Sequence, residues 1–187
     1  MKHIYLSGVA IVLVLSAGLF GLSRAFSAKQ IPIKTIVVPI SSASVSLAMS
    51  SSSPRATLAI NISDIVPGQS ITREVTITNT GTVGLAGIYL RASISSDSLL
   101  LSPGGIHLAV LRCSRPPIKL SSTFACPAAS TVASRPLSKY GQATTVANGV
   151  ASGVSVYLVF TFSLPTSASN SYANQTAGVS WQFEGVS

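Results

Sequence analysis

Residues 154–164 read VSVYLVFTFSL, and this stretch decides the fold that we expect for the chain. Apolar side chains occupy every second position from Val154 to Leu164, while Ser155, Tyr157 and Thr161 lie between them. Alternation with a period of two places one set of side chains on a buried face and the other toward solvent. The stretch therefore predicts a β-strand with one buried face.

The same alternation recurs along the chain, in residues 58–62, 71–77, 88–94 and 179–183. Turn-forming residues separate these stretches, as in Pro67-Gly68 and Asn79-Thr80-Gly81. Short, frequent strands without an amphipathic helix predict an all-β fold in which two antiparallel sheets pack as a sandwich. The periodicity fits an immunoglobulin-like and a jelly-roll topology equally well. Residues 127–149 are less patterned, and we expect a long surface excursion there with one strand near residues 144–147.

The charge of the chain comes from a scarcity of acids. The formal net charge is +8, with 12 Lys and Arg against four carboxylates, Asp64, Glu74, Asp97 and Glu184. The bases are scattered, whereas a nucleic-acid site clusters them on one face, so we expect no nucleic-acid partner. The densest group, at residues 112–119, is interpreted as a solvated loop, although attraction to an acidic cell envelope fits it equally well.

An uncharged apolar stretch, residues 4–22, follows Lys2 and His3 near the start of the sequence. Small residues at Ala25 and Ser27 suit a signal peptidase, so residues 1–27 are interpreted as a signal peptide with a helical core. The stretch is also long enough to span a bilayer, which leaves an uncleaved anchor as the alternative. Under either interpretation the rest of the chain is exported, to the cell surface or beyond. We expect membrane contact only through this segment.

Two cysteines, Cys113 and Cys126, enclose a stretch rich in Pro and Ser. In an exported protein an isolated pair at this spacing most simply forms one disulfide. Metal ligation is the weaker interpretation, because no second pair and no nearby histidine completes a set of ligands.

Residues 30–40 read QIPIKTIVVPI, an apolar, β-prone segment between the leader and a Ser-rich linker at residues 50–53. We therefore divide the exported part into a donor-strand segment with its linker, residues 28–54, and a sandwich domain, residues 55–187. A β-prone strand on a flexible connector can pack on its own domain or add to the open edge of a neighbour. The donor hypothesis assigns the contact to the apolar residues of this segment, Ile31, Ile33, Ile36, Val37, Val38 and Ile40.

No motif in the sequence indicates catalysis, and we expect neither an enzyme nor a cofactor. No HExxH, GxSxG, P-loop or dinucleotide fingerprint occurs, and His107 is the only histidine after the leader. One such histidine and four dispersed acids predict neither catalytic nor metal-ligating residues. Two sequons, at Asn61 and Asn174, are possible glycosylation sites if the organism modifies them.

Residues 57–90 resemble the TasA/camelysin family of exported biofilm-fibre proteins. In that family an apolar strand, a PGxS turn, a strand rich in Val and Thr and an NxGT turn follow one another. The corresponding residues of this chain are Pro67, Gly68, Ser70, Asn79, Gly81 and Thr82. The leader ending in AFS, the LRCS motif with the later Cys126, and the closing residues 164–185 are also similar to parts of that family.

The resemblance implies a jelly-roll subunit that polymerises into extracellular fibres of a biofilm matrix or cell surface. The N-terminal strand of one subunit would complete the sheet of the next, so the expected partner is another copy of the chain. Other matrix or cell-envelope components are further candidate partners. The alternative function is a monomeric, immunoglobulin-like adhesion module at the cell surface. The metallopeptidase label of some relatives does not fit the residues of this chain.

Overall fold

The computed structural model describes residues 35–37, 42–47, 54–94 and 98–187. These residues form twelve strands and three short 3-10 helices. The strands are β1 Thr35–Val37, β2 Ser42–Leu47, β3 Arg55–Ile62, β4 Ser70–Asn79, β5 Leu85–Ile94, β6 His107–Cys113, β7 Ile118–Lys119, β8 Phe124–Ala125, β9 Ser130–Pro136, β10 Thr144–Val150, β11 Ser155–Ser163 and β12 Ala177–Val186. The 3-10 helices are η1 Leu99–Leu101, η2 Leu137–Lys139 and η3 Asn170–Tyr172.

The predicted leader, residues 1–27, lies outside the described residues. Within the described ranges, no helix combines the length and the apolar character needed to cross a membrane.

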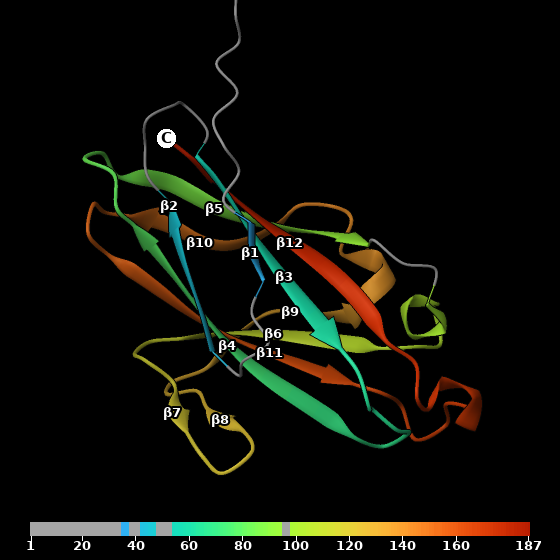
Figure 1. Cartoon of the computed structure of the whole chain (residues 1–187). Helices are drawn as coiled ribbons and strands as arrows, with labels where there is room; N and C mark the ends of the chain where they lie inside the picture. The colour runs from blue at the N-terminus through green and yellow to red at the C-terminus, as the bar shows by residue number, and fades with distance from the viewer. Residues whose placement is uncertain (1–34, 38–41, 48–53, 95–97) are drawn as a thin grey trace, which may run out of the picture. The chain divides into compact units, whose positions relative to one another are not determined.

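The strands form two main sheets, which confirms the all-β sandwich predicted from the alternating stretches (Figure 1). In the first sheet, β3, β12, β5 and β10 are antiparallel neighbours in that order, and β1 adds in parallel beside β3. In the second, β4, β11, β6 and β9 are antiparallel neighbours, and β2 adds in parallel beside β4. The small strands β7 and β8 pair only with each other within the described residues.

The chain crosses between the two main sheets at almost every connection. From β3 onward it alternates between them, and only β6 and β9 follow one another within the same sheet. The hairpin of β7 and β8 is inserted between these two strands. Strands that are neighbours in a sheet are therefore distant in sequence.

The core lies between the sheets and is centred on Trp181 of β12, which is fully buried. The ring centroids of Phe160, Phe162 and Tyr140 lie 5.1, 6.2 and 5.8 Å from that of Trp181. Such edge-on and tilted contacts are favoured by the quadrupoles of the rings. The predicted inward residues of β3, β5, β11 and β12 are buried, apart from the strand-end residue Ile94. Val154 is also 46% exposed, because it lies in the turn before β11.

Residues 127–149 do not form the surface excursion that their weak pattern suggests. They contain β9, η2 and most of β10, and both strands extend the main sheets. β10, Thr144–Val150, confirms the one strand that was expected near residues 144–147. Each of the two is an edge strand with one irregularity in its ladder, beside Val110 for β9 and between Thr145 and Ala147 for β10. An interrupted edge strand buries no regular row of side chains, so its sequence carries little period-two signal. β2 differs from them: its ladder is continuous and its sequence, SASVSL, alternates, yet it lies within residues 28–54, which the sequence assigns to the donor segment and linker.

The Pro67-Gly68 turn joins β3 to β4. The Gln69 amide donates to the Val66 carbonyl at 3.0 Å, and Gly68 has φ +86°. A type II turn requires a positive φ at its third position, which glycine adopts without strain.

Asn79 ends β4 and is fully buried. Its side-chain amide donates to the carbonyl oxygens of Val83 and Val150, at 2.9 and 3.1 Å, and its Oδ1 accepts from the Gly81 amide at 3.1 Å. Its main-chain amide donates to the Val154 carbonyl at 3.0 Å. One side chain therefore joins the β4–β5 turn to the end of β10.

We expect Asn79→Ala to lower the free energy of unfolding by about 3 kcal/mol, because the substitution leaves buried backbone groups without partners. Urea unfolding followed by Trp181 fluorescence measures the effect. Asn148→Ala, at an exposed position of β10, is the matched control and should change stability by less than about 0.5 kcal/mol. Equal effects of the two substitutions would contradict a structural role for Asn79.

Candidate assembly interface

The two N-terminal strands lie on the same side of the sandwich. β1 pairs with β3 and β2 pairs with β4, and β2 also contacts β3. β3 and β4 border this side of the two sheets, so the N-terminal segment adds one strand to each sheet there. We call this the β3–β4 side.

The ladder between β1 and β3 is short. Thr35, Ile36 and Val37 face Thr57, Leu58 and Ala59 in parallel register. A backbone hydrogen bond contributes a net stabilisation of about 1 kcal/mol, so three paired residues contribute on the order of a few kcal/mol. β2 has the longer ladder, from Ser42 opposite Glu74 to Leu47 opposite Asn79. β1 is therefore the more easily displaced of the two strands.

The predicted donor residues lie partly in this ladder. Ile36 and Val37 belong to β1, where they pair with β3 of the same chain. Ile31, Ile33, Val38 and Ile40 lie outside the described residues, as does the Ser-rich linker. The single chain therefore occupies its own β3 edge with residues that the sequence assigns to a donor strand.

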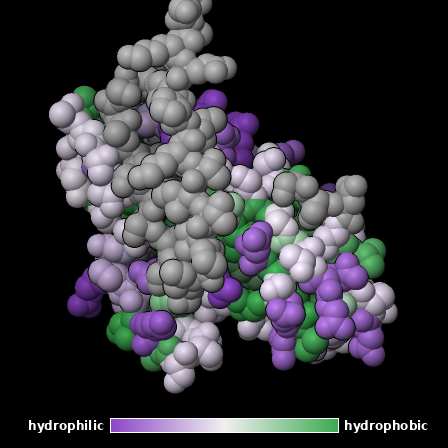
Figure 2. All heavy atoms as spheres, viewed as in Figure 1, coloured by the Kyte–Doolittle hydropathy of each residue, from purple (hydrophilic) through white to green (hydrophobic). Residues whose placement is uncertain are grey.

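The strands behind this edge carry the core. Leu58 of β3 and Val75 and Ile77 of β4 are fully buried. Apolar atoms are visible on the surface near the end of β3 and the start of β4, among polar ones (Figure 2). Both edges of the β3–β4 side are thus backed by apolar side chains.

Arg73 interrupts the apolar row of β4. It is the register partner of the fully buried Phe160, yet it is only half-buried and donates to the Thr72 carbonyl at 2.9 Å. Burial lowers the pKa of its guanidinium below the usual value. The described part of the β2 ladder begins one residue further on, at Glu74. An inward charge at the border of a sheet opposes strand addition, so Arg73 disfavours pairing at its own position on β4.

The opposite side of the sandwich has the edge strands β9 and β10, and we call it the β9–β10 side. Both strands have irregular ladders, and β9 carries an arginine, Arg135, in register with the buried Leu108. The Arg135 guanidinium lies 4.4 Å from the ring centroid of Tyr140 and donates to the Thr144 hydroxyl on β10. Bulges and inward charges are the features that protect natural sheet edges from pairing. The β3–β4 side therefore accepts additional strands, whereas the β9–β10 side is protected against strand pairing.

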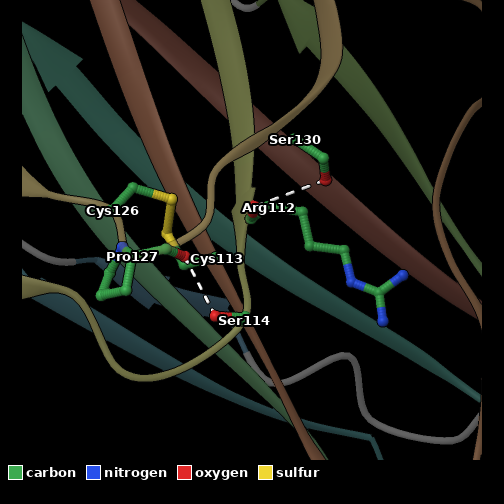
Figure 3. Close-up of a disulfide and its surroundings, with 6 residues drawn as sticks. All are labelled: Arg112, Cys113, Ser114, Cys126, Pro127 and Ser130. Carbon is green, nitrogen blue, oxygen red and sulfur yellow. Dashed lines mark hydrogen bonds between the residues drawn. A yellow bond between two sulfur atoms is a disulfide. The ribbon is translucent and has the colours of Figure 1, made fainter.

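The predicted disulfide joins Cys113 to Cys126, with a Cα–Cα distance of 5.1 Å, and closes the β7–β8 hairpin (Figure 3). The Ser114 hydroxyl donates to the Pro127 carbonyl beside it, at 3.2 Å. Closing a loop of this length stabilises the fold by about 3 kcal/mol in the chain-entropy model. The Arg112 side chain extends away from the sulfur atoms (Figure 3). It lines a groove of about 400 Å³ that is formed by the end of β6, the start of β9 and the start of β11.

The remaining sequence candidates are dispersed. Asn61 on β3 and Asn174, which has φ +61°, are both exposed. His107 is half-buried at the start of β6. No three His, Cys, Asp or Glu residues gather closely enough to hold a metal ion in the described part of the chain.

Comparison with protein-family models and with curated proteins found no match.

Sequence reasoning missed Arg135 and Tyr140, which join the two sheets at the β9–β10 side. The available signal is compositional: residues 98–183 contain no Asp or Glu, so Arg135 has no acidic partner nearby in sequence. In a stretch without acids, an arginine can contact an aromatic ring and a hydroxyl group in place of a carboxylate. The hydroxyl of Tyr140 donates to the Leu108 carbonyl at 3.0 Å, and burial raises its pKa to about 12, partly opposed by the charge of Arg135.

The raised pKa of Tyr140 predicts a loss of stability in alkali. Between an unfolded pKa of about 10 and the folded value, only the folded state keeps the phenolic proton, so stability falls as pH rises through this window. At pH 8 we expect Tyr140→Phe to be less stable than wild type by about 1 kcal/mol, and this difference should shrink above pH 10. Urea midpoints from pH 8 to 11.5 measure it, and a difference independent of pH would contradict the assignment.

Proposed function

We propose that this protein is the structural subunit of an extracellular filament, in which the N-terminal strand of one copy completes a sheet of the next. One observation carries the proposal: an apolar segment, β1, pairs with the β3 edge through a ladder that covers three residues in the described part of the chain. A strand held this weakly in its own chain can be replaced by the same strand of a neighbour. The identical parallel ladder would then join two copies.

The order of the strands supports a jelly roll as the finer description of the sandwich. Four antiparallel strands, β3-β12-β5-β10, face β4-β11-β6-β9, and the connections cross between the sheets. Eight strands in two packed sheets with such crossings are typical of a jelly roll, whereas an immunoglobulin fold divides seven strands differently. The resemblance of residues 57–90 to TasA/camelysin proteins points to the same architecture and to assembly into fibres.

The exchange requires β1 to leave β3 of its own chain. β1 and β2 have separate ladders, on β3 and on β4, so β1 could leave while β2 keeps its ladder. The released strand would pair with β3 of the next copy. The displaced β1 of that copy would then pair with β3 of a third copy. A head-to-tail contact of this kind generates an open filament when the rotation between successive copies does not close into a ring. The protected β9–β10 side favours growth along this one direction.

An extracellular location follows from the same proposal. The disulfide suits an oxidising compartment, and the apolar residues 4–22 with Ala25 and Ser27 suit export through a signal peptide. The partner is then another copy of the chain in a biofilm matrix or on a cell surface.

Engineered cysteines distinguish exchange between copies from pairing within one copy. Thr35 and Thr57 are register partners, and neighbouring strands lie about 4.8 Å apart, within the range that a disulfide spans. A mixture of Thr35→Cys chains with Thr57→Cys chains should therefore give covalent heterodimers after oxidation. Non-reducing gel electrophoresis with mass spectrometry detects them.

Thr161→Cys, on an interior strand of the other sheet, is the matched control and should give no such dimer with Thr35→Cys. The double variant Thr35→Cys/Thr57→Cys should form covalent ladders of several copies. If it forms only internal disulfides while the wild-type protein is assembled, β1 remains in its own chain and the exchange mechanism is wrong.

Removal of the donor segment should abolish assembly without unfolding the sandwich. We expect the chain lacking residues 28–41 to stay soluble and unpolymerised, because the sandwich from β3 to β12 keeps its core. Negative-stain microscopy and circular dichroism check the two statements. A chain in which a Gly/Ser stretch of equal length replaces residues 28–41 controls for spacing. Filaments formed by either variant would overturn the proposal, and absence of filaments from the wild type would favour a monomeric adhesion module.

A further inference from the structure

The corner between β9 and β10 contains a pocket of about 320 Å³ that strand exchange does not use. It is lined by Arg135, Ser138, Lys139, Gly141 and Gln142, and we call it the corner pocket. These residues lie at the end of β9, in η2 and in the following turn, on the β9–β10 side.

The loop that forms the pocket is fixed from below by two anchors. Leu137 and Tyr140 are both fully buried. The Leu137 amide donates to the Ile106 carbonyl at 2.9 Å, and the Ala92 amide donates to the Tyr140 carbonyl at 2.8 Å. The lining residues Ser138, Lys139, Gly141 and Gln142 lie between or directly after these anchors. The pocket is thus preorganised by the core rather than formed by a free loop.

The pocket is cationic and rich in hydrogen-bond donors. Its lining includes the Arg135 guanidinium and the exposed Lys139 ammonium but no carboxylate. An arginine has five N–H donors, and within the described residues Arg135 gives one of them to Thr144. The Nε of Arg135 and the Oγ of Ser138 lie below the surface and have no hydrogen-bond partner among the described residues. The exposed Lys139 ammonium is therefore the donor most accessible to a ligand.

Arg135 is held in place independently of any ligand. The ring of Tyr140 lies against its guanidinium and Thr144 accepts from it, which restricts the side chain before a ligand arrives. A restricted guanidinium loses little entropy on binding, and its planar fork matches the paired oxygen atoms of an oxyanion. Lys139 adds a second charge, and the amide of Gln142 adds a neutral donor.

We propose that the corner pocket binds a single oxyanion group, namely a carboxylate, sulfate or phosphate. An acidic polysaccharide of the cell surface and free inorganic anions both carry this chemistry. The site lies on the side opposite β1 and is independent of strand exchange. Carboxylates of this chain do not compete for it locally, because residues 98–183 contain neither Asp nor Glu.

Equilibrium dialysis of the full chain against radiolabelled sulfate or phosphate tests the proposal at constant ionic strength. The method works for single chains and for filaments, so failure of strand exchange does not affect it. We expect saturable binding of one anion per chain, and about tenfold weaker binding by Lys139→Gln. Lys119→Gln, which removes the same charge from the disulfide hairpin, is the matched control and should bind as wild type does. Near-UV circular dichroism confirms that each variant is folded.

Two further measurements identify the source of the anion. Displacement of sulfate by oligogalacturonate would support a carboxylated polysaccharide as the ligand. Displacement by phosphate but not by oligogalacturonate would support a free anion at the same site. Equal loss of binding in Lys139→Gln and Lys119→Gln, or binding without saturation, would show only diffuse charge attraction and would overturn the proposal.

Discussion

Burial of Trp181 between the two sheets is the constraint on which the rest of the structure depends. This side chain contacts the rings of Phe160 and Phe162 from the second sheet and of Tyr140 from the β9–β10 corner. These contacts hold the two sheets face to face, and the strand order within each sheet then places β3 and β4 on one side and β9 and β10 on the other. The β3–β4 side and the β9–β10 side follow from that packing, and so do the proposed roles of both.

The β3–β4 side and the β9–β10 side differ in how their sheet edges are covered. On one side a weakly held N-terminal strand covers the edge, whereas on the other an inward arginine and two ladder irregularities protect it. A molecule with one receptive and one protected side can add copies without aggregating in every direction. The proposed filament and the proposed oxyanion site therefore occupy different surfaces and need not compete.

The sequence predicted the parts of the fold whose side chains alternate strictly. The buried rows of β3, β5, β11 and β12 were recognised because each of these strands has one apolar and one polar face. β9 was missed because an interrupted edge strand carries no such period. β2 was missed although SASVSL alternates, because its small residues lie between the apolar segment and the Ser-rich linker. Of the candidate site, the β-prone character of Ile36 and Val37 was visible in sequence. The pairing of Arg135 with Tyr140 was not, since it depends on how the sheets face each other.

The position of β12 has a consequence for biogenesis. This strand separates β3 from β5 in the middle of the first sheet, yet more than eighty residues lie between the end of β5 and its start. A sheet built from segments so distant in sequence folds slowly, because the entropy cost of closing the long loops comes before strand pairing stabilises the sheet. If the chain is exported and assembles as proposed, its first sheet would stay incomplete until the last strand is synthesised. The topology would then disfavour premature joining of nascent chains before export.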